Sequence, residues 1–302
     1  MLRNLLLFLS RQKKAEHWLM AFPGATKVAS QFVAGDTLAK AIRVVRSLNQ
    51  QNLLATLDHL GENVTTLEEA ARARNDYMAI LEEISLESLP STISVKLTQL
   101  GLDLSETACR SHLFALTERT EGTESFLQVD MEDSAHTDSI LRIVSDTHRT
   151  CPVVGAVIQA YLYRSEQDVQ RLLSEGIRIR LCKGAYKEPS SIAYPHKADV
   201  DANYMRLTQL LLQSRLYHSI ATHDQKIIDL TRQYAIEIGV PKHRYEFQML
   251  FGVRRDLQQQ LVSEGYRVRI YVPFGKDWFP YFMRRLAERP ANLAFVTRNL
   301  FH

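Results

Sequence analysis

The stretch LYHSIATHDQKIIDLTRQYAIEIGVPKHRYEFQML, residues 216–250, contains one complete strand–helix–strand unit. Residues 216–224 and 245–250 are short runs rich in apolar, β-branched and aromatic side chains, which is typical of buried strands. Residues 224–239 between them carry apolar side chains at helical spacing, and Gly239 is a natural point for the helix to end. The unit therefore predicts two neighbouring strands joined by a helix.

The same alternation continues along the chain. Residues 65–84 and 199–215 also have helical spacing, and Thr65 or Thr66, followed by glutamates, is a candidate N-cap. Eight strand-like segments separated by helices over about 240 residues favour a (β/α)8 barrel, of the α/β class, over the rival doubly wound open sheet. The segments are 53–61, 93–101, 126–132, 154–162, 178–186, 216–224, 245–250 and 267–275.

The chain is long enough for a large single core or for two ordinary domains, with 302 residues of which 45% are hydrophobic. Residues 1–50 precede the first strand and are predicted to form a helical N-terminal arm or a cap, leaving residues 51–302 for the barrel. Charged residues make up 24%, the net charge is +3, and there is no acidic or basic tail. No nucleic-acid partner is therefore expected.

Cysteine usage and the first residues bear on the compartment. Cys109, Cys151 and Cys182 are an odd number without metal-type spacing, which indicates a reducing cytoplasmic compartment and no structural disulfides. The start, MLRNLLLFLSRQKK, has an apolar run of about six residues, far short of the roughly 20 that span a membrane. Residues 2–14 could touch the inner face of the cell membrane, and a plain amphipathic helix is the alternative.

Polar residues occur along most of the strand-like segments. The carboxyl ends of barrel strands meet at one face, where active sites lie, so these groups are expected to converge on one cavity. A single such group is commonly a solvated rim residue, and His59 is better explained as a satisfied strand-end histidine than as a proton carrier. The candidates are His59, Lys96, Asp130, Gln159, Arg180, Lys183, Thr222, His223, Glu246, Gln248 and Tyr271.

Several familiar site patterns are missing from the sequence. There is no His-Glu-x-x-His, no serine nucleophile elbow and no Gly-x-Gly-x-x-Gly, so neither a metal site nor a Rossmann-type dinucleotide site is predicted. Lys96 and Lys183 both lie on predicted strands, which keeps a Schiff-base lyase open as an alternative function. A flavin- or ligand-binding regulator without catalytic activity is a third.

The segment YVPFGKDWFPYFMRRLAERPANL, residues 271–293, contains an amphipathic helix with two adjacent arginines. Its polar face can be a solvated surface with Arg–Glu pairs, each worth a few tenths of a kcal/mol. It can equally be a carboxylate clamp, because guanidinium groups bind carboxylates in a planar, bidentate way. The polar face contains Tyr281, Arg284, Arg285 and Glu288, and the apolar stripe contains Phe279, Phe282, Met283 and Leu286.

Several linked motifs make the sequence resemble the proline dehydrogenase family. The resemblance runs from about residue 53 to residue 300 and rests on the order and spacing of the motifs together. It implies oxidation of L-proline to Δ1-pyrroline-5-carboxylate, with FAD as cofactor and a quinone as electron acceptor. The length resembles the bacterial single-function form, since no aldehyde dehydrogenase segment follows. The motifs are SVKLTQLG, VDMEDS, VIQAY, RIRLCKGAY, ATHD, YEFQMLFG and YFMRRLAERPANLAFV.

The resemblance also implies a distorted barrel, with the last helix laid over the barrel mouth, and a substrate site beneath that helix. Arg284 and Arg285 would bind the proline carboxylate, with Lys96 assisting from its strand. Glu288 would orient the arginine pair, and Tyr281 would pack on the proline ring.

The remaining implied roles concern the reacting centre and the cofactor. Leu250 would line the apolar side of the proline pocket, and Asp130 and Tyr271 would shape the pocket around the reacting atoms. Arg180 would lie beside the flavin near its reactive nitrogen, where it would stabilise developing negative charge. The FAD-binding residues would be Met131, Gln159, Arg180, Lys183, Gly184, Ala185, Thr222 and His223.

Overall fold

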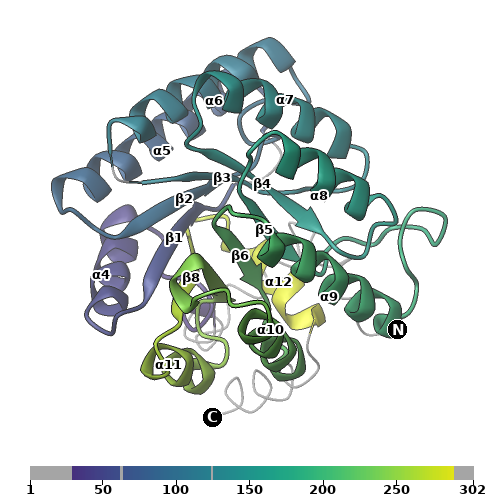
Figure 1. Cartoon of the computed structure of the whole chain (residues 1–302). Helices are drawn as coiled ribbons and strands as arrows, with labels where there is room; N and C mark the ends of the chain where they lie inside the picture. Colours follow the sequence, from purple (N-terminus) through teal and green to yellow (C-terminus); the bar gives the residue numbers. More distant parts are fainter. Residues whose placement is uncertain (1–28, 62–63, 124, 289–302) are drawn as a thin grey trace.

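The computed structural model describes residues 29–61, 64–123 and 125–288. Eight parallel strands pair in chain order and close on themselves, because β8 pairs with β1 (Figure 1). The predicted (β/α)8 barrel is confirmed, and no strand of this sheet is left with an unpaired edge. The strands are β1 Leu54–His59, β2 Ser91–Val95, β3 Leu127–Val129, β4 Val154–Gln159, β5 Ile179–Cys182, β6 His218–Ala221, β7 Tyr245–Leu250 and β8 Arg267–Phe274.

Helices surround the strands, and α5 to α11 each connect one strand to the next. The N-terminus of α5 has the local chemistry that the sequence indicates: the hydroxyl of Thr66 accepts a hydrogen bond from the Glu69 amide, and the Glu69 carboxylate accepts one from the Thr65 amide. The helices are α4 Leu38–Asn49, α5 Leu67–Leu86, α6 Glu106–Glu121, α7 Thr137–Thr150, α8 Ser165–Ser174, α9 Lys197–Gln213, α10 Gln225–Glu237, the 3-10 helix η1 Lys242–Arg244, α11 Arg255–Ser263 and α12 Trp278–Glu288.

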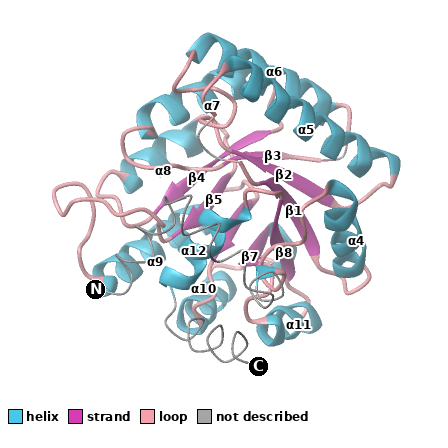
Figure 2. Cartoon of the chain, turned by 180° about the vertical axis from the view of Figure 1, so that it is seen from behind, coloured by secondary structure: helices cyan, strands magenta, loops and turns pink. Residues whose placement is uncertain are grey.

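The first and last of these helices show how the barrel is distorted. Helix α4, which precedes β1, packs against β1 and β8 on the outside of the barrel, with Ala41 and Val45 buried in the main core. In a regular barrel that place in the outer ring belongs to the helix that follows β8. Here α12 follows β8 and instead lies across one end of the barrel (Figure 2).

An apolar cluster holds α12 at that end. Its helix side chains pack on residues 29–33 and on Leu60, which follows β1, and Val253 and Tyr271 pack against the same cluster. The division of the chain into an arm of residues 1–50 and a barrel of residues 51–302 stays a prediction, since residues 1–28 lie outside the described part. The buried members from α12 are Trp278, Phe279, Tyr281, Phe282 and Met283.

The strands separate an apolar outer layer from a polar interior. Successive side chains on a strand point to opposite faces, and the buried Leu57 and Val129 belong to the core between strands and helices. Their neighbours Asp58 and Asp130 point to the inside of the barrel, where both contact Lys96. Barrel interiors are commonly filled by bulky branched side chains, so a charged interior marks a place where the fold positions chemistry.

Candidate active site

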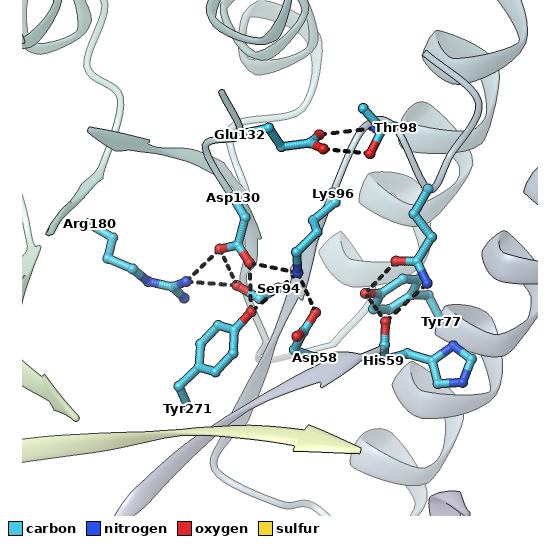
Figure 3. A network of polar contacts seen from close by, with 11 residues as sticks. Asp58, His59, Tyr77, Ser94, Lys96, Thr98, Asp130, Glu132, Arg180 and Tyr271 are labelled. Carbon is cyan, nitrogen blue, oxygen red and sulfur yellow. Dashed lines mark hydrogen bonds and ion pairs between the residues drawn. The ribbon is translucent and has the colours of Figure 1, made fainter. Parts of the chain in front are cut away.

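Four charged side chains from four different strands meet inside the barrel, near the carboxyl ends of the strands (Figure 3). Lys96, directly after β2, places Nζ 3.0 Å from Asp58 Oδ1 and 3.4 Å from Asp130 Oδ2. Arg180 on β5 donates from Nη1 to Asp130 Oδ1 at 2.8 Å. The two carboxylates and two cations balance in charge, which a buried ionic cluster requires.

Asp130 is the centre of this network. Besides Lys96 and Arg180, Tyr271 OH donates to its Oδ2 at 2.7 Å and Ser94 Oγ donates to its Oδ1 at 3.0 Å. The guanidinium carbon of Arg180 lies 5.4 Å from the centre of the Tyr271 ring. Four donors therefore fix one carboxylate, and Tyr271 contacts both the network and the cluster beneath α12.

The network shifts the pKa values of its two carboxylates in opposite directions. Burial alone would raise the pKa of Asp130, but the charges of Lys96 and Arg180 and the bonds from Tyr271 and Ser94 hold the pKa below its ordinary value. Burial raises the pKa of Asp58, and the neighbouring Asp130 charge adds to the rise against the opposing effect of Lys96. Asp130 therefore stays ionised, and Asp58 is the easier of the two to protonate.

Tyr271 keeps its proton for the same reasons. Burial raises the pKa of Tyr271 far above its ordinary value, and the charges of Asp130 and Asp58 raise it further. The phenol is thus a permanent donor to Asp130 over the working pH range.

Asp58 was not predicted from the sequence, which drew attention to His59 instead. Asp58 is fully buried and inside the barrel, whereas His59 packs between the rings of Tyr77 and Phe274, whose centres lie 6.3 Å and 5.2 Å away. The interpretation of His59 as a strand-end residue agrees with this position. Strict alternation along β1 would have shown that only one of the two neighbours can face the interior.

The residues that the resemblance assigns to FAD lie at or just after the carboxyl ends of β3 to β6, except Arg180, which is the second residue of β5. Gln159 joins two of these strand ends: its Oε1 accepts from the Ala185 amide at 3.3 Å, and its Nε2 donates to the Glu132 carbonyl at 2.8 Å. Glu132 in turn accepts hydrogen bonds from the amide and the hydroxyl of Thr98 (Figure 3). Met131 lies between Asp130 and Glu132 and is buried.

Gly184 makes a close approach that only glycine permits. Its φ is +122°, and a Cβ atom would lie 2.3 Å from the ring of Tyr161. The Tyr161 amide also donates to the Lys183 carbonyl at 2.9 Å. The loop after β5 is therefore pressed against the end of β4, which fixes the backbone that would face a cofactor.

Lys183 lies between two carboxylates rather than in an apolar pocket. Its Nζ is 2.5 Å from Asp201 Oδ1 and 3.0 Å from Asp224 Oδ2, and both aspartates also contact Lys197. A Schiff-base lysine needs to lose its charge, which desolvation or a nearby cation favours. Lys183 and Lys96 are both ion-paired with carboxylates rather than placed in an apolar pocket, and this geometry gives the lyase alternative no support.

Thr222, His223 and Leu250 join the ends of β6 and β7. The Leu250 amide donates to Nε2 of His223 at 2.8 Å, so this ring is held against the end of β7. The hydroxyl of Thr222 accepts from the amide of Asp224, the residue that caps α10. The assigned cofactor residues and the assigned apolar wall of the substrate site are thus in direct contact.

Helix α12 brings its aromatic and basic residues to the barrel end. Phe279, Phe282 and Met283 of the predicted apolar stripe are buried, and Tyr281 is buried with them, at 6% exposure. Arg284 and Arg285 are half-buried, and the guanidinium carbon of Arg285 lies 5.1 Å from the centre of the Tyr281 ring. The side chains of Leu286 and Glu288 fall outside the described part, so the orienting role of Glu288 stays a prediction.

Glu246 and Gln248 do not join this network of hydrogen bonds, but both line a small cavity that Arg180 also lines, so their predicted convergence holds with Arg180 alone of the network. Glu246 is the second residue of β7 and therefore lies toward the opposite end of the barrel. Its carboxylate accepts from Arg269 Nε at 2.9 Å and from Tyr217 OH at 2.7 Å. Gln248 donates to the same carboxylate at 2.6 Å. The two residues belong to a separate polar layer deeper in the barrel.

Comparisons with known proteins show the family of the chain. The family model for proline dehydrogenase matches residues 41–298. Proline dehydrogenase 1 of Bacillus subtilis subsp. natto is 42% identical over 300 residues and covers 99% of each chain. Proline dehydrogenase of Deinococcus radiodurans is 39% identical over 286 residues, 90% of each chain.

A solved structure extends the likeness to the fold. Proline utilization A of Bdellovibrio bacteriovorus, inactivated by N-propargylglycine, superposes with a TM-score of 0.82 at 26% identity. The match covers 87% of this chain and 33% of that one. The likeness in sequence and fold extends over nearly the whole chain, which belongs to the proline dehydrogenase family.

Proposed function

We propose that the protein oxidises L-proline to Δ1-pyrroline-5-carboxylate with FAD as its cofactor, the first step of proline catabolism to glutamate. Membership of the family over nearly the full length supports this reaction. The observation that carries it is the charge-balanced network of Asp58, Lys96, Asp130 and Arg180, closed by Tyr271 at the barrel end. Such a network can orient a small charged substrate without adding net charge to the pocket.

The side chains around the network fit a flavin. Arg180 uses only Nη1 in hydrogen bonds to described residues, so Nη2 is available to an acceptor on a ligand. Gln159, Thr222 and His223 add polar groups at the same strand ends, and Gly184 lets the backbone lie close. When bound, FAD would supply the two-electron acceptor for the oxidation. We assign its binding to the eight residues that the resemblance implies.

We assign the substrate carboxylate to Arg284 and Arg285, with Lys96 assisting. Proline offers few groups for recognition, so charge-assisted bonds to its carboxylate must provide most of the affinity. The cluster that holds α12 includes Tyr281 and contacts Tyr271, which brings this helix next to the network. Leu250 would complete the pocket on the apolar side of the ring, and Glu288 would orient the arginines.

The reaction takes a hydride equivalent from the ring carbon next to nitrogen, which bound FAD would accept, and the nitrogen then releases a proton to solvent. Asp130 keeps its negative charge and can face the positive charge that develops on the substrate nitrogen. Tyr271 and Arg180 hold that carboxylate in one orientation through its two different oxygens. We therefore give Asp130, Arg180 and Tyr271 the roles closest to the reacting atoms.

We propose a quinone as the electron acceptor, which the family resemblance supports. None of the helices within the described residues is long and apolar enough to span a bilayer. The expected contact of residues 2–14 with the inner face of the membrane lies outside the described part and stays a proposal, as does the cytoplasmic location.

An absorption spectrum of the purified protein, before and after anaerobic L-proline, tests the proposal. Flavin bands near about 370 and about 450 nm, the second bleaching with proline, are the expected result. A protein that stays colourless after addition of FAD would contradict the flavin assignment. In that case borohydride trapping with substrate would test the lysine-based alternative.

A further inference from the structure

A polar cavity lies inside the barrel, one layer of side chains nearer the amino ends of the strands than the charged network. Its volume is about 40 Å³. A volume of about 10–15 Å³ is enough for one water molecule if two to four polar partners surround it. The residues that line the cavity include Thr92, Gln128, Arg180, Glu246, Gln248 and Arg269.

Three buried polar atoms of this lining make no hydrogen bond within the described residues. They are Nε2 of Gln128, Oε1 of Gln248 and Nε of Arg180, and each of the three side chains is only 5% exposed. Two are donors and one is an acceptor. Buried groups of this kind are almost always satisfied by protein or by ordered water, and one water can accept from both donors and donate to the acceptor.

The floor of the cavity fixes the orientation of Gln248. The Glu246 carboxylate is occupied by Arg269, Tyr217 and Ser219, and it also accepts from Nε2 of Gln248. Oε1 of Gln248 is therefore the end of the amide that remains to accept a bond. Glu246 therefore has four other donors, and Nε of Arg180 makes no bond to it.

We propose that this cavity binds water, and that Gln128 and Gln248 position the Arg180 guanidinium through that water. Nη1 of Arg180 is held from one side by Asp130 and Ser94 at 2.8 Å each. A water on Nε holds the other side and fixes the plane of the group. Gln128 and Gln248 are thus positioning residues, and this role rests on the proposed function, in which Arg180 lies beside the flavin.

A crystal structure of the purified protein tests the water site without any reference to activity. We expect density for water within about 2.7–3.2 Å of at least two of the three atoms. A cavity without such density, or side-chain amides turned to bond one another directly, would overturn the site.

Variants then test the positioning role. Gln128→Met and Gln248→Met keep the side-chain length but remove the bonds to water; Gln248→Met also removes the bond to Glu246, so Gln128→Met is the cleaner variant. Gln233→Met makes the same change on the exposed face of α10. We expect flavin reduction by proline to slow about tenfold in each interior variant. KM should stay unchanged, the flavin midpoint potential should become more negative, and Gln233→Met should match the unvaried protein.

The outcomes separate this proposal from the proposed function. An unchanged reduction rate and potential in both interior variants would overturn the positioning role. If the unvaried protein shows no flavin reduction by proline, the proposed function fails, while the crystal structure still decides the water site. If the variants do not fold, the crystal structure of the unvaried protein decides the proposal: a cavity with water supports it, and an empty cavity overturns it.

Discussion

The hydroxyl of Tyr271 on β8 donates a 2.7 Å hydrogen bond to Asp130, the residue directly after β3. The same tyrosine packs against the apolar cluster beneath α12. One side chain therefore connects the charged network inside the barrel to the helix that covers its end. A substitution in the charged network should therefore affect α12, and a substitution in α12 should affect the network.

Removing that hydroxyl tests the connection. We expect Tyr271→Phe to lower kcat/KM for proline about tenfold, because Asp130 loses one of its four donors while the ring packing is kept. Steady-state kinetics measure the effect. Tyr234→Phe, which removes a hydroxyl bonded to Gln213 on the outer helices, is the matched control and should change nothing. Equal activities of the two variants would contradict the role of the bond.

Lys96→Met should destabilise the protein strongly. The change leaves the Asp58 and Asp130 carboxylates buried without the ammonium group between them, and breaking a buried pair costs about 3–5 kcal/mol. Adding Asp58→Asn should recover part of the lost stability, because it removes one of the two negative charges that repel each other once Lys96 is absent. Urea unfolding of the two single variants and the double variant measures the coupling. Strictly additive losses would show that the network is not a unit.

The arginines of α12 should affect substrate and not cofactor. We expect Arg284→Ala or Arg285→Ala to raise KM for proline by about 10- to 100-fold, the effect of losing a charge-assisted bond of about 1.5–3 kcal/mol. Bound FAD per protein should be unchanged. Arg149→Ala, on an exposed part of α7, provides the control. Loss of flavin from the α12 variants would mean that the helix serves the cofactor instead.

Gly184→Ala should weaken both stability and flavin binding. The new methyl group would meet the Tyr161 ring, and φ of +122° strains any side chain. Gly239→Ala is the comparison, because Gly239 also has positive φ, at +71°, but open space around it. We expect a loss of about 1 kcal/mol for Gly239→Ala and a larger loss, with a raised Kd for FAD, for Gly184→Ala. Equal decreases in Tm for the two variants would show that the contact between Gly184 and the Tyr161 ring has no effect of its own.

His136 makes stability depend on pH. Burial alone would lower the pKa of His136, but hydrogen bonds to Asp103 and Asp133 raise it above 6.5. A histidine whose pKa is higher in the folded state stabilises the protein fully at pH values below its unfolded-state pKa. This stabilisation is lost as the pH rises through the folded-state pKa. His136→Gln should therefore lower Tm most near about pH 6 and least near about pH 9. A constant difference in Tm across that range would contradict the expectation.

The strands could be predicted from sequence, but not where each one ends. The predicted run 245–250 coincides with β7, whereas the run 93–101 continues beyond β2, which ends at Val95. Leu97 and Leu100 are fully buried in the core although they lie in the turn after the strand. Apolar spacing reports burial, so it cannot separate a strand from a buried turn that follows it.

The site was predictable where charge and motif agreed. Lys96, Asp130, Arg180 and Tyr271 were expected near one another, and they form the network. Asp58 was missed because nothing in a single strand shows that it pairs with Lys96 from the next one.

Glu246 was misplaced for a different reason. The predicted run 245–250 matches β7, but Glu246 is only the second residue of that strand, so its backbone lies well before the carboxyl end. Depth along a strand is a tertiary property, set by register with the neighbouring strands.

The position of α4 has a consequence for synthesis of the chain on the ribosome. Leu54–His59 of β1 pairs with Arg269–Phe274 of β8, and α4 covers both strands. Strand β1 and helix α4 are therefore synthesised more than two hundred residues before β8, the strand on which both pack. Until Phe274 emerges, the outer edge of β1 stays unpaired and the part of α4 that packs on β8 stays uncovered. Chaperones can bind this open intermediate, and its unpaired strand edge also makes it prone to aggregation.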